Sequence, residues 1–454
     1  MLWTTEVLSR IQFAFTITFH GVFPTLNVGL GVFLVYWESL YLKTGAPFYK
    51  SLCQFWSKIF ALSFGMGVVS GVVLAYELGA NFSGFTYFAG NILGPLMTME
   101  TLSAFFLEAG FLGIMLFGWE KVTARTHFLS TCFVCAGTII SLMWIMSANS
   151  FMHTPAGYLI EDGVLVPDSW LSAIFNPSYI VRSSHMLIAS LLSTCFVIMG
   201  ISSYYLIKRQ SVTYASASFI PALFVAVVLS ITQVGLGDLV GINVLENQPI
   251  KTAAMEGNWQ TQAGAPLILF AIPDQKNQRN LYEIKIPKLA SLINTHSWDG
   301  VLPGLDQAPL DRQPPVASVF FTFRIMVGIG FLFVLLSSLG AYFVYKKNLP
   351  RKRWYLRLLV ASMPLGFVAT ICGWMTSEIG RQPWTVYNLL LTKDSVSRLP
   401  AEQVMVSLLT IFVVYMSFFA AYLYFMCKTV RKGPGDLSPP DGLGYLISSV
   451  SKYD

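Results

Sequence analysis

The chain has 454 residues, of which 54% are apolar, 15% are aromatic and only 11% are charged. This composition excludes an ordinary water-soluble domain and indicates an integral membrane protein. The formal net charge of +6 is small and bears on membrane orientation, so we expect no nucleic-acid partner.

Apolar windows long enough to cross about 30 Å of hydrocarbon recur along the whole chain. They lie near residues 12–40, 54–78, 92–119, 127–149, 183–207, 217–237, 317–345, 355–376 and 404–427. We therefore predict an all-α integral membrane protein, a bundle of nine transmembrane helices. The first window lacks a small-residue cleavage site, so we expect a retained span rather than a removed signal peptide.

These windows divide the chain into three parts. Residues 1–237 carry helices one to six, residues 238–316 form a long loop, and residues 317–454 carry helices seven to nine and a C-terminal tail. Loops of this length are usually functional or disordered. Lys251, Glu256 and a high aromatic and apolar content favour an ordered, functional loop.

Basic residues predict which side of the membrane each connection faces. The larger share of the 29 Lys and Arg residues falls on one side, including a cluster at 346–357 and Lys452 near the chain end. Short cytoplasmic loops carry the excess of positive charge, so that side is predicted to be the cytoplasm. The N-terminus and the long loop then lie outside, and the C-terminus lies inside.

Histidines are few and most are predicted to lie outside the spans. Of the five, His20 and His185 fall on predicted spans, His127 falls at a cytoplasmic helix start, and His153 and His296 fall in external loops. Taken singly, His20 and His185 are each as compatible with a hydrogen-bonded structural residue as with a metal ligand.

Two further side chains on the spans could accompany these histidines. Met326 follows Arg324 on the seventh span. A lone methionine usually serves packing, but a buried arginine needs an anion, and a haem propionate is one candidate. At the end of the eighth span, Glu378 is costly at membrane depth unless it is paired, protonated or bound to a cation. Arg381, three residues later, offers an interfacial ion pair as the simpler explanation.

The predicted topology places four plausible iron ligands at a similar depth in the outer half of the membrane: His20, His185, Met326 and Glu378. Histidine with methionine would give a six-coordinate, electron-transferring haem. A lone histidine or carboxylate would leave a coordination position open for a gas such as oxygen.

Carboxylates on the third span suggest a proton path. Glu100 and Glu108 are eight residues apart, which is about 80° round a helix and about 12 Å along it. Ser141 and Asn149 repeat that offset on the fourth span. Chains of buried carboxylates mark proton relays, although hydrogen bonding between helices is the alternative.

These stretches together resemble subunit I of the cytochrome bd quinol oxidases, the terminal oxidases of bacterial and archaeal respiratory chains. The resemblance runs nearly the whole length and rests on Leu-Ser-Arg-Ile-Gln-Phe-Ala at 8–14, Phe-Phe-Leu-Glu at 105–108, Phe-Arg-Ile-Met-Val-Gly at 323–328 and Gly-Arg-Gln-Pro-Trp at 380–384. It implies a multi-pass protein of the bacterial inner membrane with three haems. Such a protein oxidises quinol and reduces oxygen to water without pumping protons.

The resemblance also implies roles for single residues. His185 and Met326 would be the axial pair of a low-spin haem b. His20 and Glu378 would ligate a high-spin haem b and the oxygen-reducing haem, usually haem d, and the assignment between them stays open. Three further residues match positions close to the haems: Arg324, Trp374 and Arg381.

The remaining implied roles concern protons, quinol and partners. Glu100, Glu108 and Ser141 match proton-pathway residues that would bring protons from the cytoplasm. Lys251 and Glu256 match residues of the quinol-binding external loop, the Q-loop. The family further implies a homologous second large subunit and, in some members, a small single-span subunit.

Two departures separate this chain from other members. Its Q-loop is short, as in the branch that includes cyanide-insensitive oxidases, so the third haem is either haem d or a haem b in its place. Leu239 also follows Asp238 where some relatives have a second carboxylate.

Three other protein classes are alternatives to this resemblance. A haem–copper oxidase needs six histidines on spans, and a dihaem cytochrome b needs paired histidines about thirteen residues apart on two helices. The sequence offers neither pattern. A non-redox ion or proton transporter using Glu100, Glu108 and Arg324 would explain the buried charges, but not the methionine and the terminal glutamate.

Overall fold

The computed structural model describes residues 3–434, so the predicted tail from residue 435 onward, with Lys452, lies outside the described residues. Within residues 3–434, nine helical spans are long and apolar enough to cross a membrane. They are Thr5–Thr44 (α1), Pro47–Asn81 (α2), Ser83–Phe117 (α3, η1 and α4), Ala124–His153 (α5), Tyr179–Lys208 (α7), Val212–Asn247 (α8), Val316–Tyr345 (α11), Arg353–Ile379 (α12 and α13) and Ala401–Lys432 (α15). The prediction of nine spans in a mostly helical chain is confirmed.

Local sequence explains where the first spans begin and end. The Thr4 hydroxyl accepts a hydrogen bond from the Val7 amide and caps the start of α1. Gly45 ends that helix with a positive φ of 65°, a conformation that glycine adopts without steric cost. Pro47 then opens α2 at a position where its missing N–H costs nothing.

Two spans are interrupted within the bundle. In the third span, a π-helical turn, Thr101–Phe105 (η1), separates α3 (Ser83–Glu100) from α4 (Phe106–Phe117). Such turns are frequent at functional sites, and this one begins directly after Glu100. In the eighth span, α12 ends at Ser362 and α13 begins at Leu365, because Pro364 cannot donate the backbone hydrogen bond that would continue the helix.

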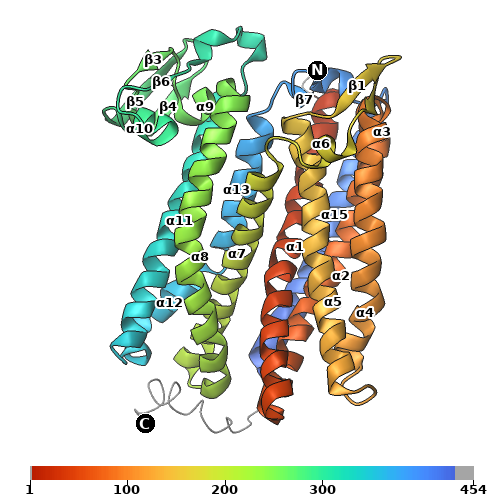
Figure 1. Cartoon of the computed structure of the whole chain (residues 1–454), viewed down its shortest axis with the longest axis vertical. Helices are drawn as coiled ribbons and strands as arrows, with labels where there is room; N and C mark the ends of the chain where they lie inside the picture. The colour runs from red at the N-terminus through yellow and green to blue at the C-terminus, as the bar shows by residue number, and fades with distance from the viewer. Residues whose placement is uncertain (1–2, 435–454) are drawn as a thin grey trace.

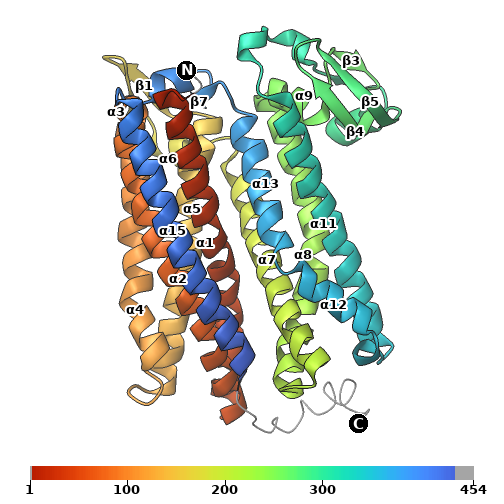
Figure 2. The same cartoon turned by 180° about the vertical axis from the view of Figure 1, so that it is seen from behind.

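The helices form two adjoining groups with α7 between them (Figure 1). One group contains α1, α2, α3–α4, α5 and α15, and α15 runs beside α1 and α2 (Figure 2). The other contains α8, α11, α12 and α13. Helix α7 contacts α1 and α5 as well as α8, α12 and α13, and its apolar window is 72% buried against 11% for α15. It is therefore the central helix of the bundle.

Short elements lie outside the spans. The helices and helical turns are Trp170–Ile174 (α6), Pro249–Glu256 (α9), Leu289–Thr295 (α10), Leu305–Gln307 (η2), Leu310–Arg312 (η3), Leu349–Arg351 (η4) and Thr392–Ser395 (α14). The strands are Tyr158–Glu161 (β1), Val164–Pro167 (β2), Gln262–Ala263 (β3), Leu267–Asp274 (β4), Arg279–Ile286 (β5), Val301–Leu302 (β6), Trp384–Val386 (β7) and Leu390–Leu391 (β8). They pair as antiparallel β1–β2, β3–β6, β4–β5 and β7–β8.

Most of these elements gather at the end of the bundle that carries the N-terminus, which we call the loop end (Figure 1). The long loop, residues 248–315, caps α8 and α11 there with α9, α10 and strands β3 to β6. The cluster of basic residues at 346–357 lies at the opposite end, in the connection after α11 and the first turns of α12.

Several helices extend beyond the predicted spans, including α5 and α8 at the loop end. Helix α8 continues to Asn247 and α5 continues to His153, whereas the apolar windows end near residues 237 and 149. Hydropathy detects only the part of a helix that fits hydrocarbon, so a polar last turn escapes it. The extension of α5 places a histidine in the candidate site.

Candidate functional site

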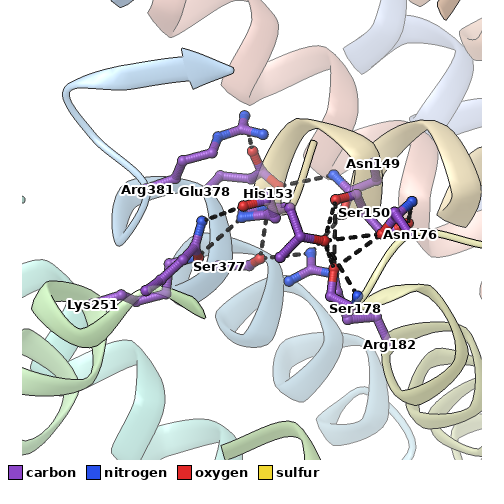
Figure 3. Close-up of polar contacts among 12 residues, drawn as sticks. Asn149, Ser150, His153, Asn176, Ser178, Arg182, Lys251, Ser377, Glu378 and Arg381 are labelled. Carbon is purple, nitrogen blue, oxygen red and sulfur yellow. Dashed lines mark hydrogen bonds and ion pairs between the residues drawn. The ribbon is translucent and has the colours of Figure 1, made fainter. Parts of the chain in front are cut away.

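The site is built around the C-terminal turn of α13 at the loop end (Figure 3). There Nη2 of Arg381 donates to Oε2 of Glu378 at 2.5 Å, and both side chains are largely buried. The helix stops because Gly380 ends its regular turn and Pro383 cannot continue the backbone hydrogen bonds. The structure therefore brings the two predicted residues together as a buried ion pair.

Helix α5 supplies the other partners of this carboxylate. Nδ2 of Asn149 donates to Oε1 of Glu378 at 2.9 Å, and Nε2 of His153 lies 3.0 Å from the same oxygen. Two carboxylate oxygens offer about four acceptor positions, and three are occupied here. The remaining acceptor position is on Oε2.

The prediction that His153 lies in an external loop is wrong. It is the last residue of α5 and only 1% exposed. Its Nδ1 lies 3.0 Å from Nζ of Lys251 on α9, and its Nε2 also lies 3.2 Å from Oγ of Ser377. Partners on α9 and α13 satisfy both ring nitrogens, which explains how a histidine can be buried here.

Three cations surround the one carboxylate. Besides Arg381 and Lys251, Arg182 of α7 donates through Nη2 to Oδ1 of Asn149 at 2.6 Å and to Oγ of Ser377 at 2.8 Å. Burial, and next the charge of Arg182, holds the pKa of Lys251 well below its usual value. Nε of Arg182 and both Nε and Nη1 of Arg381 are buried without a hydrogen-bond partner. The site thus has donors and positive charge to spare for an anionic group.

A cavity of about 220 Å³ opens beside these cations. Lys251, Arg381 and Arg312 line it, and the guanidinium of Arg312 lies 4.9 Å from the centre of the Trp384 ring. The cavity places positive charge next to an aromatic face.

His185 lies on α7 and Met326 lies on α11. Nδ1 of His185 is buried without a hydrogen-bond partner, and Nε2 lies 3.2 Å from Nε2 of Gln233 on α8. Gly373 of α13 makes room for the thioether, because a Cβ there would lie 2.7 Å from Sδ of Met326. The structure leaves the imidazole incompletely hydrogen-bonded.

Helix α2 fixes the orientation of the His20 ring through Ser70. Oγ of Ser70 donates to the Met66 carbonyl at 2.7 Å and lies 2.9 Å from Nδ1 of His20. The hydroxyl proton is used, so it accepts from Nδ1–H, which leaves Nε2 with a free lone pair. A Cβ at Gly71 would lie 3.1 Å from the imidazole Cε1, so glycine there keeps the face of the ring clear.

The other predicted haem-side residues have different surroundings. The Trp374 ring lies 6.4 Å from that of Phe13 on α1. Arg324 contacts the long loop: Nη1 donates to the Met255 carbonyl at 2.6 Å, and Nε donates to the Ile268 carbonyl at 2.8 Å. The expected anion near this arginine is therefore Glu256, at 4.0 Å.

Lys251 and Glu256 lie on the same helix, α9, but do not share a pocket. Lys251 faces His153 and the cavity, whereas Oε1 of Glu256 accepts from Nδ2 of Asn294 at 3.1 Å. Five residues correspond to about 140° round a helix, which separates the two side chains. Burial raises the pKa of Glu256 although Arg324 and Asn294 oppose the shift.

The predicted proton-path residues meet where α3, α4 and α5 pack. Oγ of Ser141 donates to Oε1 of Glu100 at 2.7 Å, at the start of the π-helical turn. Glu108 is 8% exposed and packs against Gly137, where a Cβ would lie 2.6 Å from its Cγ. Asn149 is hydrogen-bonded to Glu378 instead. We call Glu378, its partners Arg381, Asn149 and His153, and the cations Arg182 and Lys251 the Glu378 group.

Three members of the site differ from the sequence predictions. Arg182 has no sequence signal that marks it, Asn149 is predicted as part of the proton path, and His153 is predicted to lie in a loop. The signal available was helical spacing, because Asn149 and His153 are four residues apart and share a helix face.

A tetrapyrrole fits this chemistry. Within residues 3–434, no three His, Cys, Asp or Glu side chains cluster as ligands of a bare metal ion would. Haem iron needs only one or two protein ligands, which single residues such as His20, Met326 and Glu378 can supply. Surplus guanidinium donors beside Glu378 match the charge of haem propionates.

Comparisons with known proteins agree with this chemistry. A family model described as cytochrome bd terminal oxidase subunit I matches residues 8–434. The chain is 34% identical over 439 residues to cytochrome bd ubiquinol oxidase subunit 1 of Bacillus subtilis (strain 168), covering 94% of each chain. It is 31% identical over 501 residues to cytochrome bd-II ubiquinol oxidase subunit 1 of Escherichia coli (strain K12), covering 95% of this chain and 98% of the relative. The solved bd oxidase of Geobacillus thermodenitrificans matches with a TM-score of 0.88 and 30% identity, over 95% of this chain and 99% of that one.

Proposed function

The chain belongs to the cytochrome bd terminal oxidase subunit I family of haem-containing quinol:oxygen oxidoreductases, and from this premise we propose how its own residues serve that activity. It is a multi-pass membrane protein of a family that forms multi-subunit oxidases. These residues would provide the haem ligands, the quinol site and the proton path, and the charges of the loops would set the orientation in the membrane.

We propose that His185 and Met326 hold a low-spin haem b, and that His20 and Glu378 hold a high-spin haem b and a haem d, or a second high-spin haem b in its place. When bound, the haems would supply one-electron transfer and oxygen binding. The chain's own contribution is to orient the ligands. Ser70 turns the His20 ring, and Asn149 and His153 leave only Oε2 of Glu378 available.

Quinol is oxidised at the loop end, which faces the outside of a bacterial inner membrane. Lys251 lines the cavity there, so its ammonium would meet a quinol oxygen. Glu256 acts from the other face of α9, beside Arg324. Protons released from quinol leave to the outside.

Protons for water formation come from the opposite, cytoplasmic end and are not pumped. Glu108 and Glu100 hold them in turn, and Ser141 keeps the Glu100 carboxylate in place. A homologous second large subunit, joined in some members of the family by a small single-span subunit, completes the enzyme, with quinol and oxygen as substrates.

The single observation that carries this function is the Glu378 group, in which three cations surround one carboxylate and leave buried guanidinium nitrogens unpaired. The Glu378→Gln variant should lose one high-spin haem, because a neutral amide is a poor iron ligand. Haem content per purified chain measures this. The matched control is Glu120→Gln, whose side chain is 83% exposed and far from the site. Equal haem content in both variants would reject Glu378 as a ligand.

A further inference from the structure

His153 occupies a position between two parts of the proposed mechanism. Its imidazole lies 3.0 Å from Lys251, on the loop helix α9, and 3.0 Å from Glu378, at the end of α13 (Figure 3). No other described side chain is hydrogen-bonded to both residues. The contact is buried, since His153 is 1% and Lys251 is 2% exposed.

Hydrogen-bond chemistry gives this bridge a direction. The Glu378 carboxylate, ion-paired with Arg381, has acceptors and no donor, so Nε2 of His153 must carry the proton and donate to Oε1. Nδ1 of the neutral imidazole then accepts from Nζ of Lys251. Any change at Lys251 alters the group that sets the donor strength and orientation of Nε2–H.

Holding the helices together does not require this bridge. Nε2 of Gln248, the residue before α9, already donates to the backbone carbonyl of His153 at 2.9 Å. The Tyr387 amide likewise joins the α5 end to β7–β8 through the Met152 carbonyl at 2.9 Å. Both hydrogen bonds are accepted by backbone carbonyls of α5, so the contacts between these elements do not depend on the His153 ring alone.

We propose that His153 is a positioning residue that links occupancy of the Lys251 cavity to the Glu378 carboxylate. A quinol head group that engages Lys251 draws the ammonium from Nδ1, and the ring then shifts relative to Oε1 of Glu378. Occupancy of the quinol site would thereby change the orientation of the Glu378 carboxylate that would hold a haem iron. This inference rests on the proposed roles of Lys251 and Glu378.

The test compares the effect of Lys251→Met in three backgrounds: native, His153→Leu and His153→Gln. Glutamine restores one acceptor and one donor, whereas leucine restores neither. The readout is the oxidised-to-reduced ratio, at a fixed potential, of the haem lost in Glu378→Gln. It is followed optically in full complexes in lipid nanodiscs, with the low-spin haem spectrum as a check on folding.

Lys251→Met should change that ratio by about fivefold in the native and His153→Gln backgrounds, and by less than about twofold in His153→Leu. With Lys251 intact, adding decylubiquinone should likewise change the ratio in the native and His153→Gln backgrounds, and should change it less in His153→Leu. An equal change in all three backgrounds, or no change in the native one, would overturn the link while leaving the haem assignment intact. Absence of haem from the unsubstituted complex would instead refute the proposed function.

Discussion

Replacing Arg381 with methionine tests the electrostatics of the site directly. The substitution removes the only cation that is hydrogen-bonded to Glu378 among the described residues, from a pair whose side chains are 7% and 13% exposed. Breaking a buried ion pair costs about 3–5 kcal/mol, because a charge is left uncompensated. Glu378 keeps the Asn149 and His153 donors and the nearby charges of Arg182 and Lys251, so the cost should fall at the lower end, near about 3 kcal/mol. At 1.36 kcal/mol per tenfold, that is about a hundredfold increase in local opening.

Amide hydrogen exchange of residues 376–387 in nanodiscs measures this opening. The matched control is Arg312→Met, which removes a guanidinium from the same cavity. Arg312 is 41% exposed and stacks on Trp384, so its loss should cost less than about 1 kcal/mol. If the amide exchange rate in Arg381→Met is within about threefold of the rate in Arg312→Met, the reasoning is refuted. The Glu378–Arg381 ion pair would then contribute little to local stability.

Other parts of the structure give four further expected outcomes. Met326→Leu should remove the low-spin haem signal from the optical spectrum while the protein still inserts, and an unchanged spectrum would reject that ligand. Glu108→Gln should slow oxygen consumption by about 100-fold without loss of haem. Gly137→Ala should do likewise by displacing Glu108, whereas Gly110→Ala, with open space around it, should not; equal rates in the two alanine variants would contradict the packing argument. Burial raises the pKa of Glu256 above 4.5, so the folded loop prefers the protonated carboxyl. Stabilisation is then full below pH 4.5 and is lost as pH rises through the raised pKa. Protease resistance of the loop should fall with pH in the native protein but not in Glu256→Gln.

Hydropathy predicted the nine spans because each must bury its backbone polar groups in about 30 Å of hydrocarbon. It could not predict how far a helix continues in polar surroundings, and for this reason His153 was assigned to a loop. The π-helical turn after Glu100 has no glycine or proline to mark it and depends on packing against α5.

The contacts of single charged residues were harder to predict than their presence. Arg324 was expected to need an anion, but backbone carbonyls of Met255 and Ile268 take most of its donors. Lys251 was assigned to a surface loop, and the structure buries it against α5. Both outcomes depend on tertiary folding of the long loop, which no spacing in the sequence encodes. The Glu378–Arg381 pair was predictable because one helical turn joins it.

Haem extraction with mass identification, combined with a reduced-minus-oxidised optical spectrum of the purified complex, tests the central claim most directly. We expect three haems on this chain. One should have a low-spin spectrum that depends on Met326. The other two should be high-spin, and one of these should disappear in Glu378→Gln. A purified, folded complex without haem on this chain would contradict it.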